Sequence, residues 1–334
     1  MNAFHKTWPI TPVAFTLSAA ILFFLLVYLP PRCNDTYYEA AFLDKEKLLE
    51  KVAPPRIILV GGSNVAFCFD SSLIREAMHV NVINAGLHIG FGIPFMLNTL
   101  AKYARAGDMI VICPEYEEFF GLFGGNENLV AFLISYPSAL SYVGVDQTAP
   151  LLLGARSLLN RKCVGALTNL RSKIFPMKQQ KSSSPPSLSP QIYKRSAFNK
   201  DGDIGIALEH SAKSPEGFWL PLYINNSGSF DAGVIPALNE FAAFMDKHGV
   251  KVVFTYPYLS DSFYRACKPS LLALESRLKS QLKIPIIGNV SDCVLPDECF
   301  YDTRYHVLTR YKGTRTNAIL SELKLIQSKA GHGR

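Results

Sequence analysis

The chain has 334 residues, of which 49% are hydrophobic and 18% charged, and its formal net charge is +7. This length is ample for a globular core and exceeds that of most single small domains. The positive charge is diffuse and no nucleic-acid motif accompanies it, so we expect no nucleic-acid partner. The seven cysteines lack the C-x-x-C spacing of a metal site, so we expect no metal, and no motif indicates a cofactor. Cys293 and Cys299 lie close together in a loop, where a disulfide and two free thiols are both open alternatives.

An uncharged segment near the amino terminus predicts a membrane anchor. No charged side chain occurs from residue 7 to residue 31, and residues 13–29 are almost wholly apolar. About 20 apolar residues span the hydrocarbon core of a bilayer, so residues 10–30 are long enough. A cleaved signal peptide is the alternative, but the run exceeds the usual length of about 7–15 residues and no small-x-small cleavage site follows it. We therefore assign residues 1–31 to an uncleaved transmembrane anchor.

The few charges beside the anchor predict its orientation. Lys6 precedes the apolar segment and Arg32 follows it. Because positive charge near a first span favours the cytoplasmic side, Lys6 places the amino terminus there, although Arg32 partly opposes this. We expect a single-pass protein of the cell membrane, with membrane lipid as the partner of its anchor and with an extracytoplasmic body. Residues 32–55 are expected to form a juxtamembrane helix and linker.

After the anchor, short apolar runs alternate with helical patterns. The apolar runs predict buried strands at residues 56–60, 80–84, 109–113, 250–255 and 284–287. Apolar residues at helical spacing predict helices at residues 71–78, 94–104, 231–248, 270–282 and 319–326. This alternation indicates an α/β domain over residues 56–330, with a mostly parallel, three-layer sheet of the flavodoxin-like kind. The active sites of such sheets lie at the carboxyl ends of the strands.

The alternation breaks between the third and fourth predicted strands, which indicates a large insert at residues 119–230. The insert contains a predicted helix over residues 149–175. Residues 178–191 follow it and are rich in Ser and Pro without an apolar period. We expect this stretch to be an exposed, mobile loop.

The first predicted strand is followed by Gly61-Gly62-Ser63-Asn64. Glycines permit a tight turn that exposes the next side chain at the edge of the sheet, where Ser63 can be a nucleophile if a base reaches it. The segment is not the G-x-S-x-G elbow, because Val65 takes the place of the last glycine. A glycine-rich turn can also begin a nucleotide-binding unit, but neither G-x-G-x-x-G nor G-x-x-x-x-G-K-[ST] occurs. A turn serine without chemistry is the remaining alternative for this segment taken alone.

A candidate base lies near the carboxyl terminus, after the fifth predicted strand. His306 follows Asp302 by four residues, and a nearby aspartate can fix the tautomer of an imidazole and stabilise its charged form. Among the other histidines, only His88, which follows the second predicted strand, competes for this role. His306 and Asp302 are therefore candidates for a base and the group that orients it, and ordinary loop chemistry is the alternative for this segment taken alone.

Together these segments resemble the SGNH/GDSL hydrolase superfamily. In that superfamily the serine follows the first strand, and the aspartate and histidine come from one loop near the carboxyl terminus. The resemblance covers residues 56–320 in block order, and it implies that Ser63 is the nucleophile, Asp302 the acid and His306 the base. The acid and base stand one residue further apart here than in the Asp-x-x-His of the superfamily.

The same resemblance implies an oxyanion hole, for which the superfamily uses a glycine after the second strand and an asparagine after the third. Gly86 and Gly90 stand at the first of these places. At the second, Glu115 and Tyr116 replace the asparagine, and an acidic side chain repels an oxyanion. Asn64, beside the serine, and Tyr116 are the candidates for the missing donor.

An amino-terminal anchor joined to such a domain is also similar to the D-alanyl-lipoteichoic acid biosynthesis proteins and the alginate acetylation proteins. This resemblance implies an extracytoplasmic serine esterase or O-acyltransferase that acts on acyl esters of cell-envelope glycans. Its partners would be an acylated glycan or acyl donor and a membrane-bound O-acyltransferase. The alternative is a catalytically weak SGNH-like scaffold that binds a glycan or such an acyltransferase. The missing asparagine favours the scaffold, and the retained Ser, Asp and His oppose it; a nucleotide-binding or unrelated α/β protein is the third hypothesis.

Overall fold

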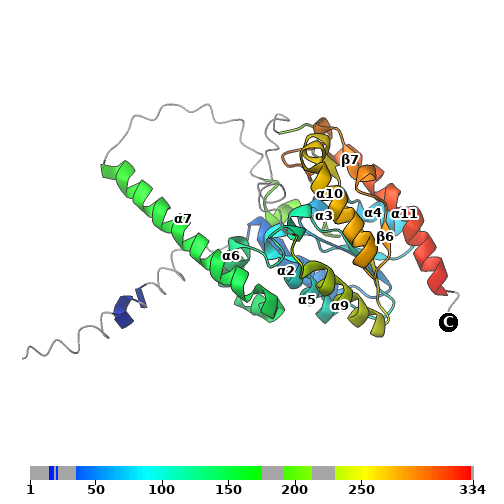
Figure 1. The fold of residues 1–334 in the computed structure, drawn as a ribbon, viewed down its shortest axis with the longest axis horizontal. Coiled ribbons are helices and arrows are strands. Elements are labelled where there is room, and N and C mark those ends of the chain that lie inside the picture. Colours follow the sequence, from blue (N-terminus) through cyan, green and yellow to red (C-terminus); the bar gives the residue numbers. More distant parts are fainter. Residues whose placement is uncertain (1–14, 19, 22–34, 175–190, 213–229, 332–334) are drawn as a thin grey trace, which may run out of the picture.

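The computed structural model describes residues 15–18, 20–21, 35–174, 191–212 and 230–331 (Figure 1). Its central sheet has five parallel strands in the order β2-β1-β3-β4-β6. The strands are β1 (Arg56–Val60), β2 (Asn81–Asn84), β3 (Met109–Ile112), β4 (Lys251–Thr255) and β6 (Ile286–Ile287). All five strands predicted from the apolar runs are confirmed, and the first of them lies inside the sheet.

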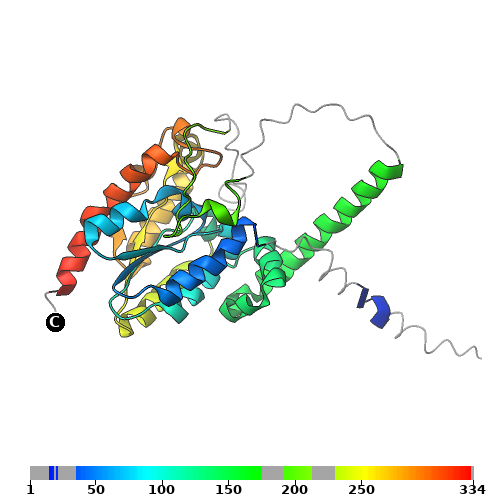
Figure 2. The same cartoon turned by 180° about the vertical axis from the view of Figure 1, so that it is seen from behind.

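Helices cover both faces of the sheet, as opposite views show (Figures 1 and 2). One group consists of α2 (Phe42–Lys51), α5 (Ile93–Tyr103) and α9 (Val234–Lys247), in which α5 contacts both of the others. The other group consists of α3 (Ser63–Cys68), α4 (Ser71–Met78) and α11 (Thr309–Gly331), and α11 contacts both of the others. The long helix α10 (Asp261–Gln281) adjoins α9, because the Asn239 side chain of α9 donates to the Gln281 carbonyl. The predicted α/β class with a parallel sheet is therefore confirmed.

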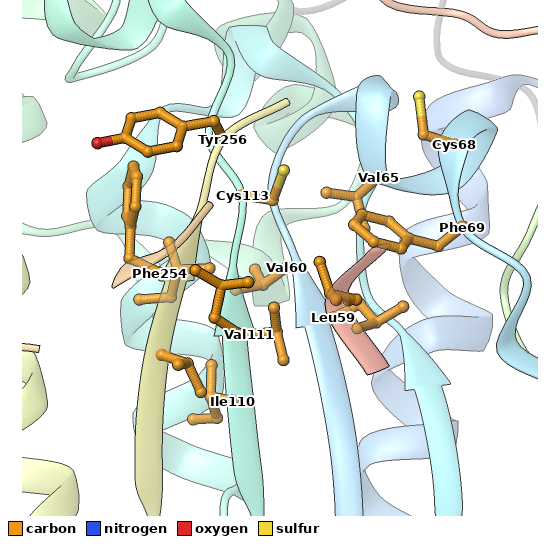
Figure 3. Close-up of a cluster of buried hydrophobic side chains, with 14 of the residues drawn as sticks. Leu59, Val60, Val65, Cys68, Phe69, Ile110, Val111, Cys113, Phe254 and Tyr256 are labelled. Carbon is orange, nitrogen blue, oxygen red and sulfur yellow. The ribbon is translucent and has the colours of Figure 1, made fainter. Parts of the chain in front are cut away.

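The strands form because their side chains are buried on both faces of the sheet. All five residues of β1 are buried, which is typical of a continuous apolar run between two helical layers. Figure 3 shows Leu59, Val111 and Phe254, from three neighbouring strands, in this core. Each such side chain contributes roughly 1.5–3 kcal/mol by leaving water. The one charged member of β1, Arg56, forms a buried ion pair with Asp108, with 2.6 Å between Nη2 and Oδ2.

The described part of the insert packs onto the sheet domain. It contains α6 (Glu127–Ser135) and α7 (Thr148–Ile174), which contact each other, and the segment 191–212. A second apolar cluster joins Phe132 of α6 and Ile192 of that segment to Phe42 of α2. Residues 178–191, expected to form a mobile loop, lie almost entirely outside the described residues.

The shorter elements are mostly single turns. A second sheet pairs β5 (Leu259–Ser260) with β7 (Val294–Leu295).

In the part of the chain that the structure describes, the 3₁₀ helices are Tyr38–Ala41, Ile89–Phe91, Tyr116–Phe119, Pro137–Tyr142, Val145–Gln147, Arg195–Ala197, Ser291–Cys293 and Asp297–Cys299. In this region Cys293 and Cys299 are buried free thiols, so the structure contains no disulfide between them.

The structure describes residues 35–55 of the expected juxtamembrane helix and linker. Their helix, α2, belongs to the helical layer of the domain, where Leu49 is buried against the sheet. The Lys45 ammonium is buried as well, and it donates to the carbonyls of Asn84 (2.7 Å) and Gly202 (2.6 Å). The helix is therefore fixed to the end of β2 and to the insert.

The predicted anchor falls largely outside the described residues. Of residues 10–30, the structure describes only 15–18 and 20–21. Within the described ranges, no helix has both the length and the apolarity needed to cross a bilayer. The anchor therefore stays a prediction from the sequence.

Candidate active site

Ser63 is the first residue of α3, and only Gly61 and Gly62 separate it from the end of β1. The tight connection depends on glycine, because a Cβ atom at Gly61 would lie 2.2 Å from the Cys113 carbonyl oxygen after β3. The chain thus turns sharply at the carboxyl end of the sheet, where Ser63 is half-buried. This is the position that the sequence predicted.

His306 comes from the loop that precedes α11. The loop is held by Thr303, whose hydroxyl accepts the N–H groups of Tyr305 (3.2 Å) and His306 (3.1 Å). Because α11 packs against α3, the loop reaches Ser63 although 243 positions separate the two residues.

A chain of hydrogen bonds joins the three residues that the sequence singled out. Ser63 Oγ lies 2.7 Å from His306 Nε2, and His306 Nδ1 lies 2.8 Å from Asp302 Oδ1. These are the contacts that a nucleophile, a base and a group that orients the base require. The arrangement can move the serine proton to the imidazole and stabilise the imidazolium beside a carboxylate. The extra residue between Asp302 and His306 does not prevent this contact.

The imidazole of His306 is held in a closed environment. Its ring stacks on Phe67 of α3, with centroids 3.7 Å apart and planes 7° from parallel. Phe67 is fully buried, and both His306 and Asp302 are 3% exposed. The ring plane is therefore fixed by packing as well as by hydrogen bonds.

Tyr193 of the insert is a further member of this group. Its hydroxyl donates to Asp302 Oδ2, the carboxylate oxygen that faces away from the main contact with His306, and lies 3.3 Å from His306 Nδ1. Burial, and then the Asp302 charge, raise the pKa of Tyr193 far above its usual value, so the hydroxyl remains a donor. The sequence carries no signal for this role, because Tyr193 follows the Ser- and Pro-rich stretch at no informative spacing.

Ser63 and His306 open into a cavity of about 490 Å³. Tyr37, Glu39 and His88 also line it, and its size suits a small ligand or part of a larger one. His88 was the competing candidate for the base. Its Nδ1 accepts the Gly90 N–H at 2.9 Å, and burial lowers its pKa, whereas His306 makes the described contact with the serine.

The two glycines expected in the oxyanion hole have N–H groups that are already bonded. The Gly86 N–H donates to Asn84 Oδ1 at 3.0 Å, and the Gly90 N–H donates to His88 Nδ1. Neither glycine lines the cavity. Both N–H groups are therefore taken by side chains, one from Asn84 at the end of β2 and one from His88 after it.

Asn64 and Tyr116, the two candidates for the missing oxyanion donor, lie in different places. Tyr116 is buried in the main core and does not line the cavity. The Asn64 side chain donates to the Cys113 carbonyl at 2.9 Å, away from the serine. The Asn64 backbone N–H, however, lies at the site and donates to Glu115 Oε1 at 3.2 Å.

The acidic residues after β3 have separate roles. Glu117 binds the catalytic loop through the Arg304 guanidinium and the Tyr305 hydroxyl. Glu115 instead reaches Ser63, whose Oγ lies 3.1 Å from Glu115 Oε1. Glu118 accepts the Glu115 N–H at 2.9 Å, and burial and the neighbouring Glu115 carboxylate raise the pKa of Glu118 well above its usual value.

No group of three or more His, Cys, Asp or Glu side chains in the described residues is arranged to hold a metal ion. No family model and no curated protein matches the chain. A solved structure from Streptococcus pneumonia, provisionally described as a platelet activating factor, is similar over 93% of this chain and 99% of its own. The identity is 9% and the TM-score 0.37, values that support no conclusion about function. The interpretation of the site rests on its geometry.

Proposed function

We propose that this chain is a serine esterase or O-acyltransferase. The observation that carries the proposal is the hydrogen-bond chain from Ser63 through His306 to Asp302, at 2.7 and 2.8 Å. It lies at the carboxyl edge of a parallel sheet, where α/β folds place their active sites, and it opens into a cavity.

The geometry supports a two-step reaction. Ser63 Oγ attacks the ester carbonyl while His306 Nε2 takes the hydroxyl proton, and the imidazolium is stabilised by Asp302. The tetrahedral intermediate collapses, the ester C–O bond breaks, and His306 returns the proton to the departing alcohol. In the second step, water or a glycan hydroxyl attacks the acyl-enzyme carbonyl and gives its proton to His306. The bond between the acyl carbon and Ser63 Oγ then breaks, and His306 returns the proton to Ser63 Oγ.

We further propose an extracytoplasmic setting and an acylated envelope glycan as the substrate, with a membrane-bound O-acyltransferase as a partner. The support is the uncharged segment 10–30 and the resemblance in architecture to envelope-acylating proteins. Protease added to intact spheroplasts should remove the body of the protein. Full protection while the inner membrane is sealed would overturn the orientation.

A fluorophosphonate probe tests the reaction directly, because it phosphonylates an activated serine. The wild type should be labelled, and Ser63→Ala and His306→Ala should not. An acylated glycan supplied with and without an acceptor glycan would then separate transfer from hydrolysis.

The scaffold is the second candidate function, and the contact between Glu115 and Ser63 favours it. A scaffold would bind an acylated glycan equally well in the wild type and in Ser63→Ala, and neither protein would react with the probe. An esterase would show probe labelling that depends on Ser63.

A further inference from the structure

The Ser63 hydroxyl has one proton and two acceptors. His306 Nε2 lies 2.7 Å from Ser63 Oγ, and Glu115 Oε1 lies 3.1 Å from it. A hydroxyl donates one hydrogen bond at a time. When the proton is directed to Glu115, His306 cannot take it as a base, so Glu115 competes with the step that activates the nucleophile.

Glu115 Oε1 also occupies the place where an oxyanion would form. The Asn64 backbone N–H donates to it at 3.2 Å, and Asn64, the residue after the serine, is one of the two candidates for the missing oxyanion donor. Such donors lie about 2.7–3.1 Å from the developing charge. The carboxylate oxygen thus takes the hydrogen bond that the substrate oxygen would need.

The carboxyl group enters this position through space that Gly62 leaves. A Cβ atom at Gly62 would lie 2.4 Å from Glu115 Oε1 and 2.9 Å from its Cδ. The Glu115 side chain is also shielded from water, since the residue is 4% exposed. A negative charge in so closed a site repels a second negative oxygen more strongly than it would in water.

We propose that Glu115 is a gate of the oxyanion site, which its carboxylate fills in the described state and must vacate before an ester can react. This inference rests on the proposed esterase function and adds a residue that restrains it. The charge adds to the obstacle, so a neutral side chain of the same shape should repel the substrate oxygen less. A glutamine would also present an N–H donor, as an asparagine does at the corresponding place in the superfamily that the sequence resembles.

Glu115→Gln is the direct test, with the rate of fluorophosphonate labelling and of small-ester hydrolysis as readouts. A single oxyanion donor changes rates by about 10²–10³-fold. We expect a smaller rise in Glu115→Gln, of at least about tenfold, because the amide still competes with the substrate oxygen for the same position. Glu115→Ala removes the charge without adding a donor, and it should give a smaller rise. Glu39→Gln is the matched control, since it removes one carboxylate from the same cavity but has no described bond to Ser63.

The outcomes separate this inference from the function on which it rests. Ser63-dependent labelling of the wild type that is not faster in folded Glu115→Gln or Glu115→Ala overturns the gate alone. An equal rise in Glu39→Gln also overturns it, because the effect would then be a general one of charge. If the wild type and both Glu115 variants all remain unlabelled, the esterase function fails together with the gate.

Discussion

The two sides of Ser63 differ in how completely they are built. On the side of the base, His306 is stacked on Phe67 and bonded to Asp302, which also accepts the Tyr193 hydroxyl. On the side of the oxyanion, the Asn64 N–H is taken by Glu115. The first side is ready for proton transfer in the described state, whereas the second is closed by a carboxylate.

Under the proposed function, the group that moves the proton is complete in the described state, whereas the site that would stabilise the tetrahedral intermediate is not. Triad residues act as a unit worth up to about 10⁶-fold in rate, and one oxyanion donor about 10²–10³-fold. Changes on the base side should therefore lower the rate, and removal of the charge on the oxyanion side should raise it. Experiments can test whether the rate changes in opposite directions on the two sides.

The largest expected effect is on the base side itself. Ser63→Ala and His306→Ala should each lower ester hydrolysis by about 10³-fold or more, with little further loss in the double variant, because the two residues act in one step. The melting temperature should change little in Ser63→Ala and should fall in His306→Ala, because that change removes a buried ring from its stack on Phe67. A His306→Ala protein that keeps most of its activity would assign the proton transfer to another group.

Asp302→Asn should be milder than either of those changes. The nucleophile and base remain, but the imidazole loses the carboxylate that fixes its tautomer, which costs roughly 10⁴-fold in a comparable site, against about 10⁶-fold for loss of the serine or histidine. Steady-state hydrolysis of a chromogenic ester measures the loss. Asp292→Asn, an exposed change outside the cavity, is the control and should leave the rate within about twofold; an equal loss in both variants would remove Asp302 from the site.

Tyr193→Phe should have a moderate effect. It removes the donor to Asp302 Oδ2, and a hydrogen bond to a charged group contributes about 1.5–3 kcal/mol, so kcat should fall roughly tenfold or more. KM should change little, because Tyr193 acts through Asp302. Tyr37→Phe removes another hydroxyl from the same cavity, and kcat values that are equal in the two variants would contradict a positioning role for Tyr193.

The smallest effect on the rate is expected at Lys45, which belongs to neither side of Ser63. Burial lowers the pKa of Lys45 to about 7, whereas in the unfolded chain it is about 10.4. Between these values the unfolded chain binds more protons, so this group makes the free energy of unfolding rise with pH.

Denaturant titrations at pH 7 and pH 9 measure this rise. The wild type should gain about 2 kcal/mol relative to Lys45→Met between the two. Hydrolysis rates of the folded proteins should agree within about twofold. A constant difference in stability between the two proteins would show that the ammonium is not desolvated.

The sheet and the group of Ser63, Asp302 and His306 could be located from the sequence, because their signals are local. A buried strand is a short apolar run, and residues just after parallel strands meet at one edge. The α2 helix was predicted as well, but its packing was not. In the sequence, Lys45 indicates a helix face in contact with water. Its burial depends on two carbonyl oxygens that only the folded structure brings to the ammonium.

The remainder of the site depends on contacts between distant segments. Tyr193 meets Asp302 across 109 positions, and no spacing rule connects them. The sequence marked Glu115 as a departure from the expected asparagine, but not its contact with Ser63. The hydrogen bonds of the two glycines were not foreseen either, because the side chains of Asn84 and His88 accept the N–H groups of Gly86 and Gly90.

The most direct test of the account is the identity of the residue that a fluorophosphonate modifies. After exposure of the folded wild type to the probe, peptide mass spectrometry should find one phosphonyl adduct, on Ser63, and none after the same exposure of His306→Ala. An adduct on a different residue, or one on Ser63 that persists without His306, would contradict the claim that this histidine activates this serine.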